Sequence, residues 1–336
     1  MKILYFAQEA WEEDYMRGKL PGIELVSYVG SIQDNAEVAD TSADALSVFV
    51  NSIVGSVEFD HFPNLKLLAT RSTGFDHIDM VEAKKRGITV VSVPSYGVNT
   101  VAEFAFALLL ALSRRVCDAH ERVAETGSFS QRDLTGFDLS GKTIGIVGCG
   151  NIGVHVVKIA NGFGMHPIVF DVKRDEALAK KLGFTYAELP ELLAQSDVIT
   201  LHVPYNKHTH HLINSGNISQ IKKGAYLINT SRGAVVETQA LVQALRSGSI
   251  AGAGLDVLEE EGDMADEMKL LTGNHPKEDE LKIILENHYL MSHPRVIVTP
   301  HIAFDTKEAI ERILDTTTEN IFAYQKGTPQ NVVTPV

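Results

Sequence analysis

The chain has 336 residues, of which 44% are hydrophobic, and its mean hydropathy is +0.01. This length is sufficient for two domains with separate cores, and the composition is typical of a globular protein. Acidic residues outnumber basic ones 43 to 30, which gives a formal net charge of −13. Such a charge disfavours nucleic acid and anionic membrane surfaces as partners.

The cysteines and the apolar segments bear on where in the cell the protein is expected. Only two cysteines, Cys117 and Cys149, are present, which is too few for a disulfide framework and favours a reducing environment. Residues 1–14 turn acidic after a short apolar run, unlike a signal peptide. The longest apolar run, 104–112, is too short to cross a bilayer. We therefore expect a cytoplasmic protein.

The first third of the chain alternates strand-like and helical patterns. Four runs predict parallel strands, because each is almost continuously apolar rather than alternating: 2–7, 46–50, 65–70 and 88–93. A helical pattern at 77–87 ends at Gly87. This alternation predicts a doubly wound α/β sheet.

A long apolar helix is predicted from Asn99 to 115. It has too many apolar residues for a helix with one exposed face, so we expect it between domains or in a subunit contact.

After a polar stretch at 127–142, a second β/α series predicts strands at 143–148, 166–171, 197–203, 224–229, 250–257 and 296–300. A last helix, 306–325, is expected to pack back on the first domain. The sequence thus predicts two doubly wound parallel-sheet domains with a cleft between them. One contains residues 1–99 plus 301–336 and the other residues 100–300. Residues 259–294 are expected to form an irregular, charged insertion.

The strongest local motif lies at the first turn of the second series. Gly148, Gly150 and Gly153 form G-x-G-x-x-G between a predicted strand and a predicted helix. This arrangement lets the backbone approach a pyrophosphate at the helix N-terminus. Asp171 ends the next strand, where an acid accepts the ribose hydroxyls of NAD. A plain tight turn is the alternative, and Lys173 and Arg174 leave NADP open.

Arg232 follows the apolar strand 224–229 in the segment INTSRGAVVE. A guanidinium at the mouth of a buried strand is costly unless an anion meets it. The sequence therefore predicts an anion site at this strand end.

Segments along nearly the whole chain resemble the D-isomer-specific 2-hydroxyacid dehydrogenases. They are ATRSTGFDHID, VPSYGVNTVAEF, LSGKTIGIVGCGNIG, SDVITLHVPYNKHTHHLIN, LINTSRGAVV, GLDVLEEE and TPHIAF. The features that resemble the D-lactate dehydrogenase branch are Tyr96, Phe304, and the three consecutive acids 259–261 with the insertion after them. The resemblance implies a central Rossmann-type NAD-binding domain, a flavodoxin-like substrate domain made from both chain ends, and a homodimer formed through the NAD-binding domain.

The resemblance also implies a catalytic trio of Arg232, Glu261 and His301. A guanidinium fork suits the carboxylate of a 2-keto acid, and a histidine can give a proton to its carbonyl oxygen. A carboxylate bonded to that histidine favours the imidazolium. Glu259 or Glu260 could hold the role of Glu261, and His301 could be an ordinary loop histidine.

The remaining expected contacts follow from the same resemblance. Expected cofactor contacts are Gly148, Gly150, Asn151, Ile152, Gly153, Asp171, His202, Val203, Pro204, Thr230 and Asp256. Expected substrate contacts are Ser72, Thr73, Gly74, Phe75, Tyr96 and Phe304; a simple turn is the alternative for the first four, and ordinary core packing for the two aromatics. The histidines 202, 208, 210 and 211 could suggest a metal, but no carboxylate or cysteine accompanies them in that segment, so none is expected. Cys149 is interpreted as a packing residue rather than a redox switch.

The expected activity is NAD-dependent reduction of a small 2-keto acid, with pyruvate preferred, to the D-2-hydroxy acid. One alternative is a relative acting on hydroxypyruvate, glyoxylate or 2-hydroxyisocaproate. Another is a dinucleotide-sensing, corepressor-like binding protein. A formate dehydrogenase is disfavoured, because that branch has glutamine at the position of Glu261.

Overall fold

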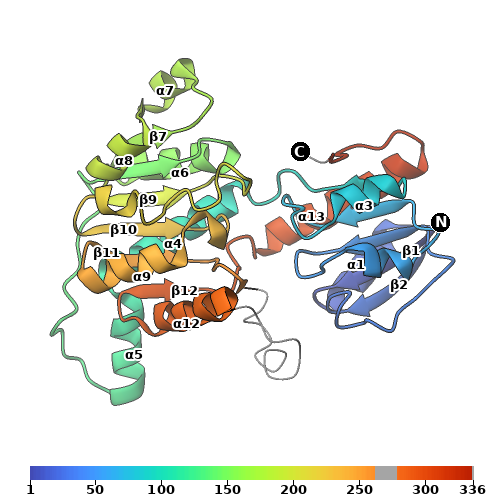
Figure 1. The fold of residues 1–336 in the computed structure, drawn as a ribbon, viewed down its shortest axis with the longest axis horizontal. Coiled ribbons are helices and arrows are strands. Elements are labelled where there is room, and N and C mark those ends of the chain that lie inside the picture. The colour runs from blue at the N-terminus through green and yellow to red at the C-terminus, as the bar shows by residue number, and fades with distance from the viewer. Residues whose placement is uncertain (262–277, 335–336) are drawn as a thin grey trace. The chain divides into compact units, whose positions relative to one another are not determined.

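The computed structural model describes residues 1–261 and 278–334, which form two compact units. One unit consists of Met1–Tyr96 and Thr306–Val336, and the other of Gly97–Asp305. In each unit, helices cover both faces of a parallel sheet (Figure 1). The predicted fold class of two parallel α/β units is confirmed.

The sheet of the first unit has five parallel strands in the order β2-β1-β3-β4-β5. They are β1 (Lys2–Ala7), β2 (Glu24–Val29), β3 (Ala45–Val48), β4 (Leu67–Thr70) and β5 (Thr89–Val91). One face packs on α2 (Ser56–Asp60) and α3 (Met80–Lys85), and the other on α1 (Trp11–Lys19) and α13 (Lys307–Gln325). The sequence pattern missed β2, because this edge strand mixes polar and apolar residues and is mostly only partly buried.

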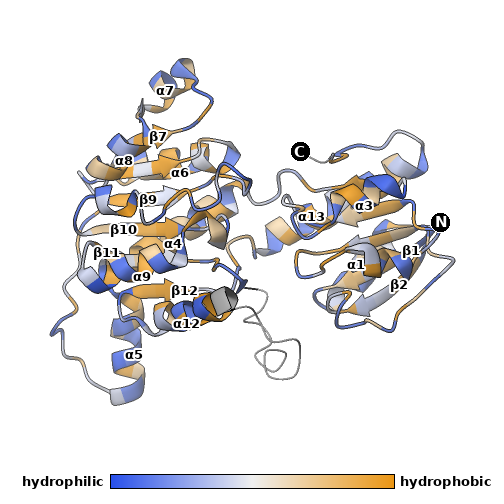
Figure 2. Ribbon diagram, in the orientation of Figure 1, coloured by the Kyte–Doolittle hydropathy of each residue, from blue (hydrophilic) through white to orange (hydrophobic). Residues whose placement is uncertain are grey.

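The described residues of the second unit form a sheet of seven parallel strands in the order β12-β11-β10-β9-β6-β7-β8. They are β6 (Thr143–Val147), β7 (His166–Phe170), β8 (Thr185–Tyr186), β9 (Val198–Leu201), β10 (Ala225–Asn229), β11 (Ile250–Leu255) and β12 (Val296–Val298). The strand order reverses between β6 and β9, and in open α/β sheets ligands bind at the carboxyl ends of strands at such a reversal. Figure 2 shows the apolar strands of both units inside helices with mixed surfaces.

The helices described in the second unit divide between the two faces of its sheet. They are α4 (Val98–Arg114), α5 (Val116–Thr126), α6 (Asn151–Gly162), α7 (Glu176–Leu182), α8 (Leu189–Gln195), α9 (Thr238–Ser247) and α12 (Glu278–Ser292). The apolar helix α4 packs against α6, β10 and β11, with Phe106 and Leu109 buried. The core of this unit therefore accounts for much of the apolar character of α4. Its expected place in a contact between domains or subunits stays a prediction.

The expectation of an irregular segment at 259–294 is wrong for its second part, where α12 forms a helix of 15 residues. The pattern was obscured because α12 buries Ile284 and Leu290 while Leu285 is exposed, so apolar residues occupy two faces. Residues 262–277 lie outside the described part of the chain. Among the described residues, no helix is long and apolar enough to cross a membrane.

Candidate active site

The glycine motif forms the turn from β6 to α6 in the second unit. Gly148 has φ +95°, and a Cβ there would lie 2.7 Å from the carbonyl oxygen of His202. A Cβ on Gly153 would lie 2.1 Å from the carbonyl oxygen of Gly148, so the helix can pack on the turn only with glycine here. Gly150 precedes Asn151 and Ile152 at the start of α6, and a Cβ there would meet no atom within 4 Å. The turn thus leaves open space at the N-terminus of a helix, where anionic groups bind.

Asp171 follows β7 and is held by the backbone of the glycine turn. Its Oδ2 accepts a hydrogen bond from the N–H of Cys149 at 2.7 Å, and its Oδ1 accepts one from the N–H of Lys173 at 2.8 Å. Burial and, secondarily, the charge of Asp171 raise the pKa of Cys149 to about 11. The thiol therefore stays protonated near neutral pH, which agrees with a packing role rather than a redox role.

Two polar atoms at the ends of β9 and β10 indicate that this sheet edge is built for a ligand. His202 follows β9, and its Nε2 lies 2.8 Å from the hydroxyl of Thr200. Burial lowers the pKa of His202 to about 3, so the ring is neutral. Within the described residues, the buried Nδ1 of His202 and the buried Oγ1 of Thr230 have no hydrogen-bond partner. Because buried polar atoms are rarely unpaired, these atoms, beside the open glycine turn, fit a bound dinucleotide. Val203 and Pro204 continue the same loop.

Arg232 is carried by a tight turn at the end of β10. The buried side chain of Asn229 closes this turn, since its Nδ2 donates to the carbonyl of Arg232 at 2.9 Å. Its Oδ1 accepts from the N–H and the hydroxyl of Ser231 at 3.0 and 2.7 Å. Nη1 of Arg232 donates to the carbonyl of Ser231 at 2.8 Å, and the side chain is half-buried.

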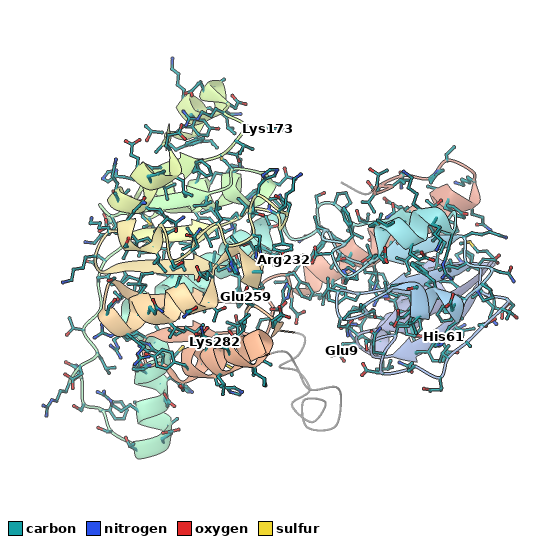
Figure 3. The ribbon with its side chains drawn as sticks, in the orientation of Figure 1. Glu9, His61, Lys173, Arg232, Glu259 and Lys282 are labelled. Carbon is teal, nitrogen blue, oxygen red and sulfur yellow. The ribbon has the colours of Figure 1, made fainter. Side chains whose placement is uncertain are left out.

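Gly233 brings the Arg232 turn against the segment that leads to Glu261. A Cβ on Gly233 would lie 2.0 Å from the carbonyl carbon of Leu258 and 2.3 Å from the backbone N of Glu259. Only glycine permits this approach of two backbones. Figure 3 labels Arg232 and Glu259 in this part of the second unit.

Glu261 and His301 form a hydrogen-bonded pair. Oε1 of Glu261 lies 2.7 Å from Nδ1 of His301, and its Oε2 accepts from the N–H of Leu258 at 3.1 Å. The two side chains are 41% and 30% exposed, so the pair is open to solvent and to a ligand. Because Nδ1 is engaged, Nε2 of His301 is the nitrogen left to exchange a proton with a substrate.

Asp256 supports the turn that carries His301. Its buried carboxylate accepts hydrogen bonds from the hydroxyl of Thr299 at 2.6 Å and from the N–H groups of Ile302 and Ala303 at 2.9 and 2.8 Å. The N–H of His301 donates to the carbonyl of Asp256 at 2.8 Å. Burial raises the pKa of Asp256, against the lowering effect of these hydrogen bonds. Asp256 thus has a structural role, and its expected contact with the cofactor stays a prediction.

The other two acids of the triple lie elsewhere. Glu259 is buried, and its Oε2 accepts from the N–H and hydroxyl of Thr238 at 3.2 and 2.8 Å. Its Oε1 lies 2.6 Å from Nε2 of His211, and no sequence pattern predicted this pair. Glu260 is exposed. Of the three acids, Glu261 is the one that meets His301. Among the described residues, no group of three potential ligands could hold a metal ion.

The expected substrate residues of the first unit form a loop after β4. The hydroxyl of Ser72 donates to the carbonyl of Gly74 at 2.6 Å, and that of Thr73 donates to the carbonyl of Val93 at 2.8 Å. In the described part of the chain, the backbone N–H groups of Thr73, Gly74 and Phe75 donate to no protein acceptor. Such a row of donors suits an anion.

The two expected aromatic contacts fall in different units. The carbonyl of Tyr96, in the first unit, accepts from Nε of Arg312 at 2.8 Å. Phe304 belongs to the second unit, where its Cβ would lie 3.8 Å from a Cβ on Gly97.

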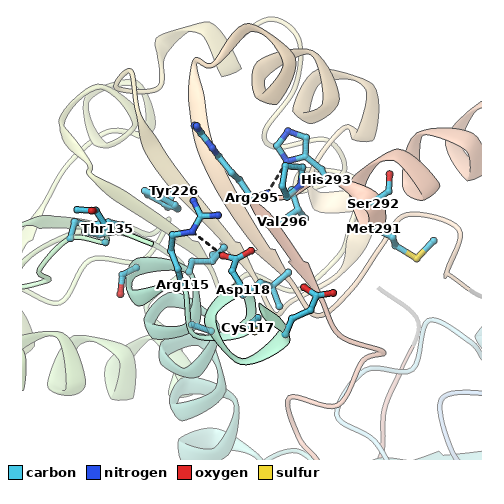
Figure 4. A pocket seen from close by; sticks show the side chains of 18 residues that line it. Arg115, Cys117, Asp118, Thr135, Tyr226, Met291, Ser292, His293, Arg295 and Val296 are labelled. Atoms are coloured by element: carbon cyan, nitrogen blue, oxygen red, sulfur yellow. Dashed lines mark hydrogen bonds and ion pairs between the residues drawn. The ribbon is translucent and has the colours of Figure 1, made fainter. Parts of the chain in front are cut away.

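A cavity of about 580 Å³ lies elsewhere in the second unit (Figure 4). It borders Tyr226 and Val296, at the amino ends of β10 and β12, and the ion pair of Arg115 and Asp118, whose Nε and Oδ2 are 2.9 Å apart. None of the expected site residues lines it. The expected cofactor and catalytic residues of this unit instead gather at carboxyl ends of strands.

These features define an α/β oxidoreductase with a dinucleotide turn and a histidine–carboxylate pair on one sheet. Residues 106–303 match the profile of the family described as D-isomer specific 2-hydroxyacid dehydrogenase, NAD binding domain. The chain belongs to this family, and it is an NAD-dependent enzyme. The resemblance seen in its sequence motifs is thereby confirmed.

Relatives differ in their named activities. The chain is 40% identical to a glyoxylate reductase of Thermofilum pendens, over 84% of this chain and 79% of that protein. It is 34% identical to a D-lactate dehydrogenase of Escherichia coli, over 97% and 98%. A D-lactate dehydrogenase from Aquifex aeolicus, solved in complex with NAD and lactic acid, superposes on this chain with a TM-score of 0.85 at 37% sequence identity. The superposition covers 97% of this chain and 96% of the Aquifex aeolicus chain.

Proposed function

We propose that the enzyme reduces a small 2-keto acid to the D-2-hydroxy acid and that pyruvate is its preferred substrate. The observation that carries this proposal is the 2.7 Å contact of Glu261 with His301, on segments next to the turn that presents Arg232. The D-lactate dehydrogenase from Aquifex aeolicus, solved in complex with NAD and lactic acid, supports the choice of substrate.

Arg232 is assigned to the substrate carboxylate. A guanidinium presents two parallel N–H donors to a carboxylate, so it fixes the orientation of the acid as well as its charge. In the first unit, the N–H groups of the loop Ser72–Phe75 are assigned to the same anion. This assignment accounts for a charged side chain at the end of an otherwise buried strand.

His301 is assigned as the proton donor. Bound NADH supplies the hydride that reduces the carbonyl carbon. Nε2 of His301 gives its proton to the carbonyl oxygen, which leaves a hydroxyl on the substrate and a neutral imidazole on the protein. Glu261, on Nδ1, stabilises the imidazolium before transfer and keeps the ring oriented. Asp256 keeps the whole turn in place.

The dinucleotide is assigned to the carboxyl ends of β6, β7, β9, β10 and β11. The pyrophosphate is assigned to the N-terminus of α6, at Gly148, Gly150, Asn151, Ile152 and Gly153. The adenosine ribose is assigned to Asp171, which repels a 2′-phosphate and so favours NAD over NADP. The remaining assigned contacts are His202, Val203, Pro204, Thr230 and Asp256. His202 and Thr230 offer the buried Nδ1 and Oγ1 atoms that have no partner among the described residues.

Selection for a small substrate side chain is assigned to Tyr96 and Phe304. Aromatic rings beside the carbon that bears the keto group leave room for a methyl group and disfavour branched substituents, at about 1–3 kcal/mol per misplaced methylene. Glyoxylate, which has hydrogen in place of the methyl group, is the second candidate, because the Thermofilum pendens relative is named for it.

A panel of 2-keto acids with NADH tests the proposal. We expect kcat/KM to be highest for pyruvate, lower for glyoxylate and 2-oxobutanoate, and lowest for 4-methyl-2-oxopentanoate, with D-lactate as the pyruvate product. A preference for glyoxylate or for the branched acid would move the enzyme to another branch of the family. NADH binding with no turnover of any acid would favour a dinucleotide-sensing binding protein instead.

We further propose a cytoplasmic homodimer. Both cysteines are free thiols, which fits a reducing compartment. Exposed apolar side chains of the second unit, Val116, Val123 and Phe129, lie on or after α5 and suit a contact between copies. Sedimentation equilibrium that finds only monomer at micromolar concentration would contradict this state.

A further inference from the structure

A buried arginine directly precedes the loop Ser72–Phe75 of the first unit. Arg71 follows β4 and is 1% exposed. Its Nη2 donates to the carbonyl of Phe6 at 2.5 Å, and its Nη1 donates to the carbonyl of Ser47 at 3.3 Å. Its guanidinium carbon lies 4.2 Å from the ring centre of Tyr5. Arg71 therefore joins three neighbouring strands, β1, β3 and β4, near their carboxyl ends.

Glu12 balances the charge of Arg71. This carboxylate is 3% exposed, and its Oε2 lies 3.8 Å from Nη2 of Arg71 and accepts the hydroxyl of Tyr5. Its Oε1 accepts from the N–H groups of Gln8 and Glu9, both at 3.1 Å. Glu9 is labelled in Figure 3. The pair therefore extends from the loop after β4 to the loop after β1.

Stability alone does not explain this buried pair. Removing two charges from water is so costly that apolar residues of similar volume often serve the fold as well or better. Burial raises the pKa of Tyr5, so its hydroxyl remains a donor to Glu12 throughout the neutral range. Since Glu12 and two carbonyls occupy the guanidinium, Arg71 is not placed to bind an outside anion itself. Its influence on a ligand must pass through the loops that it joins.

The loop after Arg71 is fixed closely at this end. The hydroxyl of Thr70 lies 2.6 Å from the hydroxyl of Ser72 and 3.0 Å from Nε2 of His77. The N–H of Arg71 donates to the carbonyl of Val48 at 2.8 Å. The three N–H groups assigned to the substrate carboxylate begin only two residues after Arg71.

We propose that Arg71 and Glu12 are positioning residues that hold the Ser72–Phe75 loop in the conformation that binds the substrate carboxylate. This inference rests on the proposed function, which assigns that loop to the carboxylate. The loop binds a charge that the substrate carries both before and during the reaction, so its displacement weakens both states alike. Such a loss raises KM and leaves kcat nearly unchanged.

The test uses the double variant Arg71→Met, Glu12→Gln, which leaves no buried charge unpaired. We expect its KM for the 2-keto acid to rise about 10- to 100-fold, because small misplacements of binding groups have effects of this size. We expect kcat to change less than about threefold, because the lost binding affects the substrate and the transition state equally. The dissociation constant of NADH should stay unchanged, because the dinucleotide is assigned to the other unit. Hydrogen exchange of the amides of Thr73, Gly74 and Phe75 should become faster.

The control is Arg86→Met, also in the first unit. Arg86 likewise pairs with an acid, Nη1 to Oδ1 of Asp60 at 2.8 Å, and lies over an aromatic ring, 5.7 Å from the centre of Phe59. It lies at the end of α3 instead of at the carboxyl ends of the strands. This variant should keep the parent KM and the parent exchange of the loop amides.

The outcomes separate the inference from the proposed function. Unchanged exchange of the loop amides together with a parent KM in the double variant overturns the positioning role. A rise in KM that Arg86→Met shows equally also overturns it. If the double variant does not fold, Arg71→Lys replaces it, because an ammonium keeps the charge but cannot reach both carbonyls. A parent enzyme without activity on any 2-keto acid refutes the proposed function, and the exchange measurement still decides whether the pair holds the loop.

Discussion

The neutral ring of His202, whose Nδ1 is buried, predicts how the folded protein responds to acid. In the unfolded chain this imidazole takes up a proton near its ordinary pKa of 6.5, whereas burial lowers its pKa to about 3 in the folded chain. Between these values the unfolded state binds more protons, so the free energy of unfolding falls as the pH falls. His202→Gln removes this contribution and keeps a polar side chain beside Thr200.

The size of the effect follows from the two pKa values. Each pH unit within this window is worth about 1.4 kcal/mol for a single group. Because the transition is gradual at its upper end, acidification from pH 6.5 to 4.5 should lower the free energy of unfolding of the parent by about 2 kcal/mol more than that of His202→Gln. The glutamine variant should be the less acid-sensitive protein.

Urea unfolding of the NAD-free protein at several pH values measures this difference. Tryptophan fluorescence reports only Trp11, in the first unit, so circular dichroism should follow the second unit. His208→Gln is the matched control, because His208 lies in the same loop region but is exposed. Equal losses of stability in the parent and in His202→Gln would refute the assignment of a neutral ring.

Three further predictions concern the assigned site. Arg232→Lys should lower kcat/KM for pyruvate by about 100-fold or more although the charge remains, because an ammonium does not form the paired fork; near-parent activity would remove Arg232 from the carboxylate. Glu261→Gln should lower kcat/KM for reduction of pyruvate, because the contact of 2.7 Å that orients the imidazole of His301 loses its carboxylate. Glu260→Gln should keep the parent kcat/KM, and a loss there instead would reassign the role. Asp171→Asn should narrow the preference for NADH over NADPH about tenfold or more, and an unchanged ratio of kcat/KM for the two cofactors would refute its contact with the ribose.

The parts that sequence reasoning predicted well are those in which local chemistry dictates the backbone. Three glycines between an apolar strand and a helix have few structural explanations other than a close turn, and the atoms around Gly148 and Gly153 show why a Cβ is not tolerated. The near-continuous apolar runs predicted parallel strands because both faces of each sheet are covered by helices. The ends of the predicted strands and helices differ from those in the structure by only a few residues.

Contacts between distant residues could not be predicted in this way. His211 meets Glu259 across 48 positions, and Arg71 meets Phe6 across 65, and no periodicity marks such pairs. Both pairs exist because parallel strands bring successive β/α turns to one edge of a sheet. Asn229 was missed for a different reason. It ends an apolar strand without any charge, yet its amide closes the turn that presents Arg232.

The turn at His301 shows why the geometry of a proton donor is hidden even when its identity is clear. His301 has φ +55°, a left-handed conformation that nothing in the segment TPHIAF announces, since it contains neither glycine nor asparagine. Such a conformation costs of order 1 kcal/mol and persists only where the surroundings enforce it. The register of β11 with β12 pairs Leu255 with Val298, which places Asp256 beside the turn, where its carboxylate accepts three hydrogen bonds. The orientation of the imidazole thus depends on the carboxylate of Asp256, 45 positions earlier in the chain. The resemblance to the family assigned Asp256 to the cofactor and did not predict that its side chain also holds this turn.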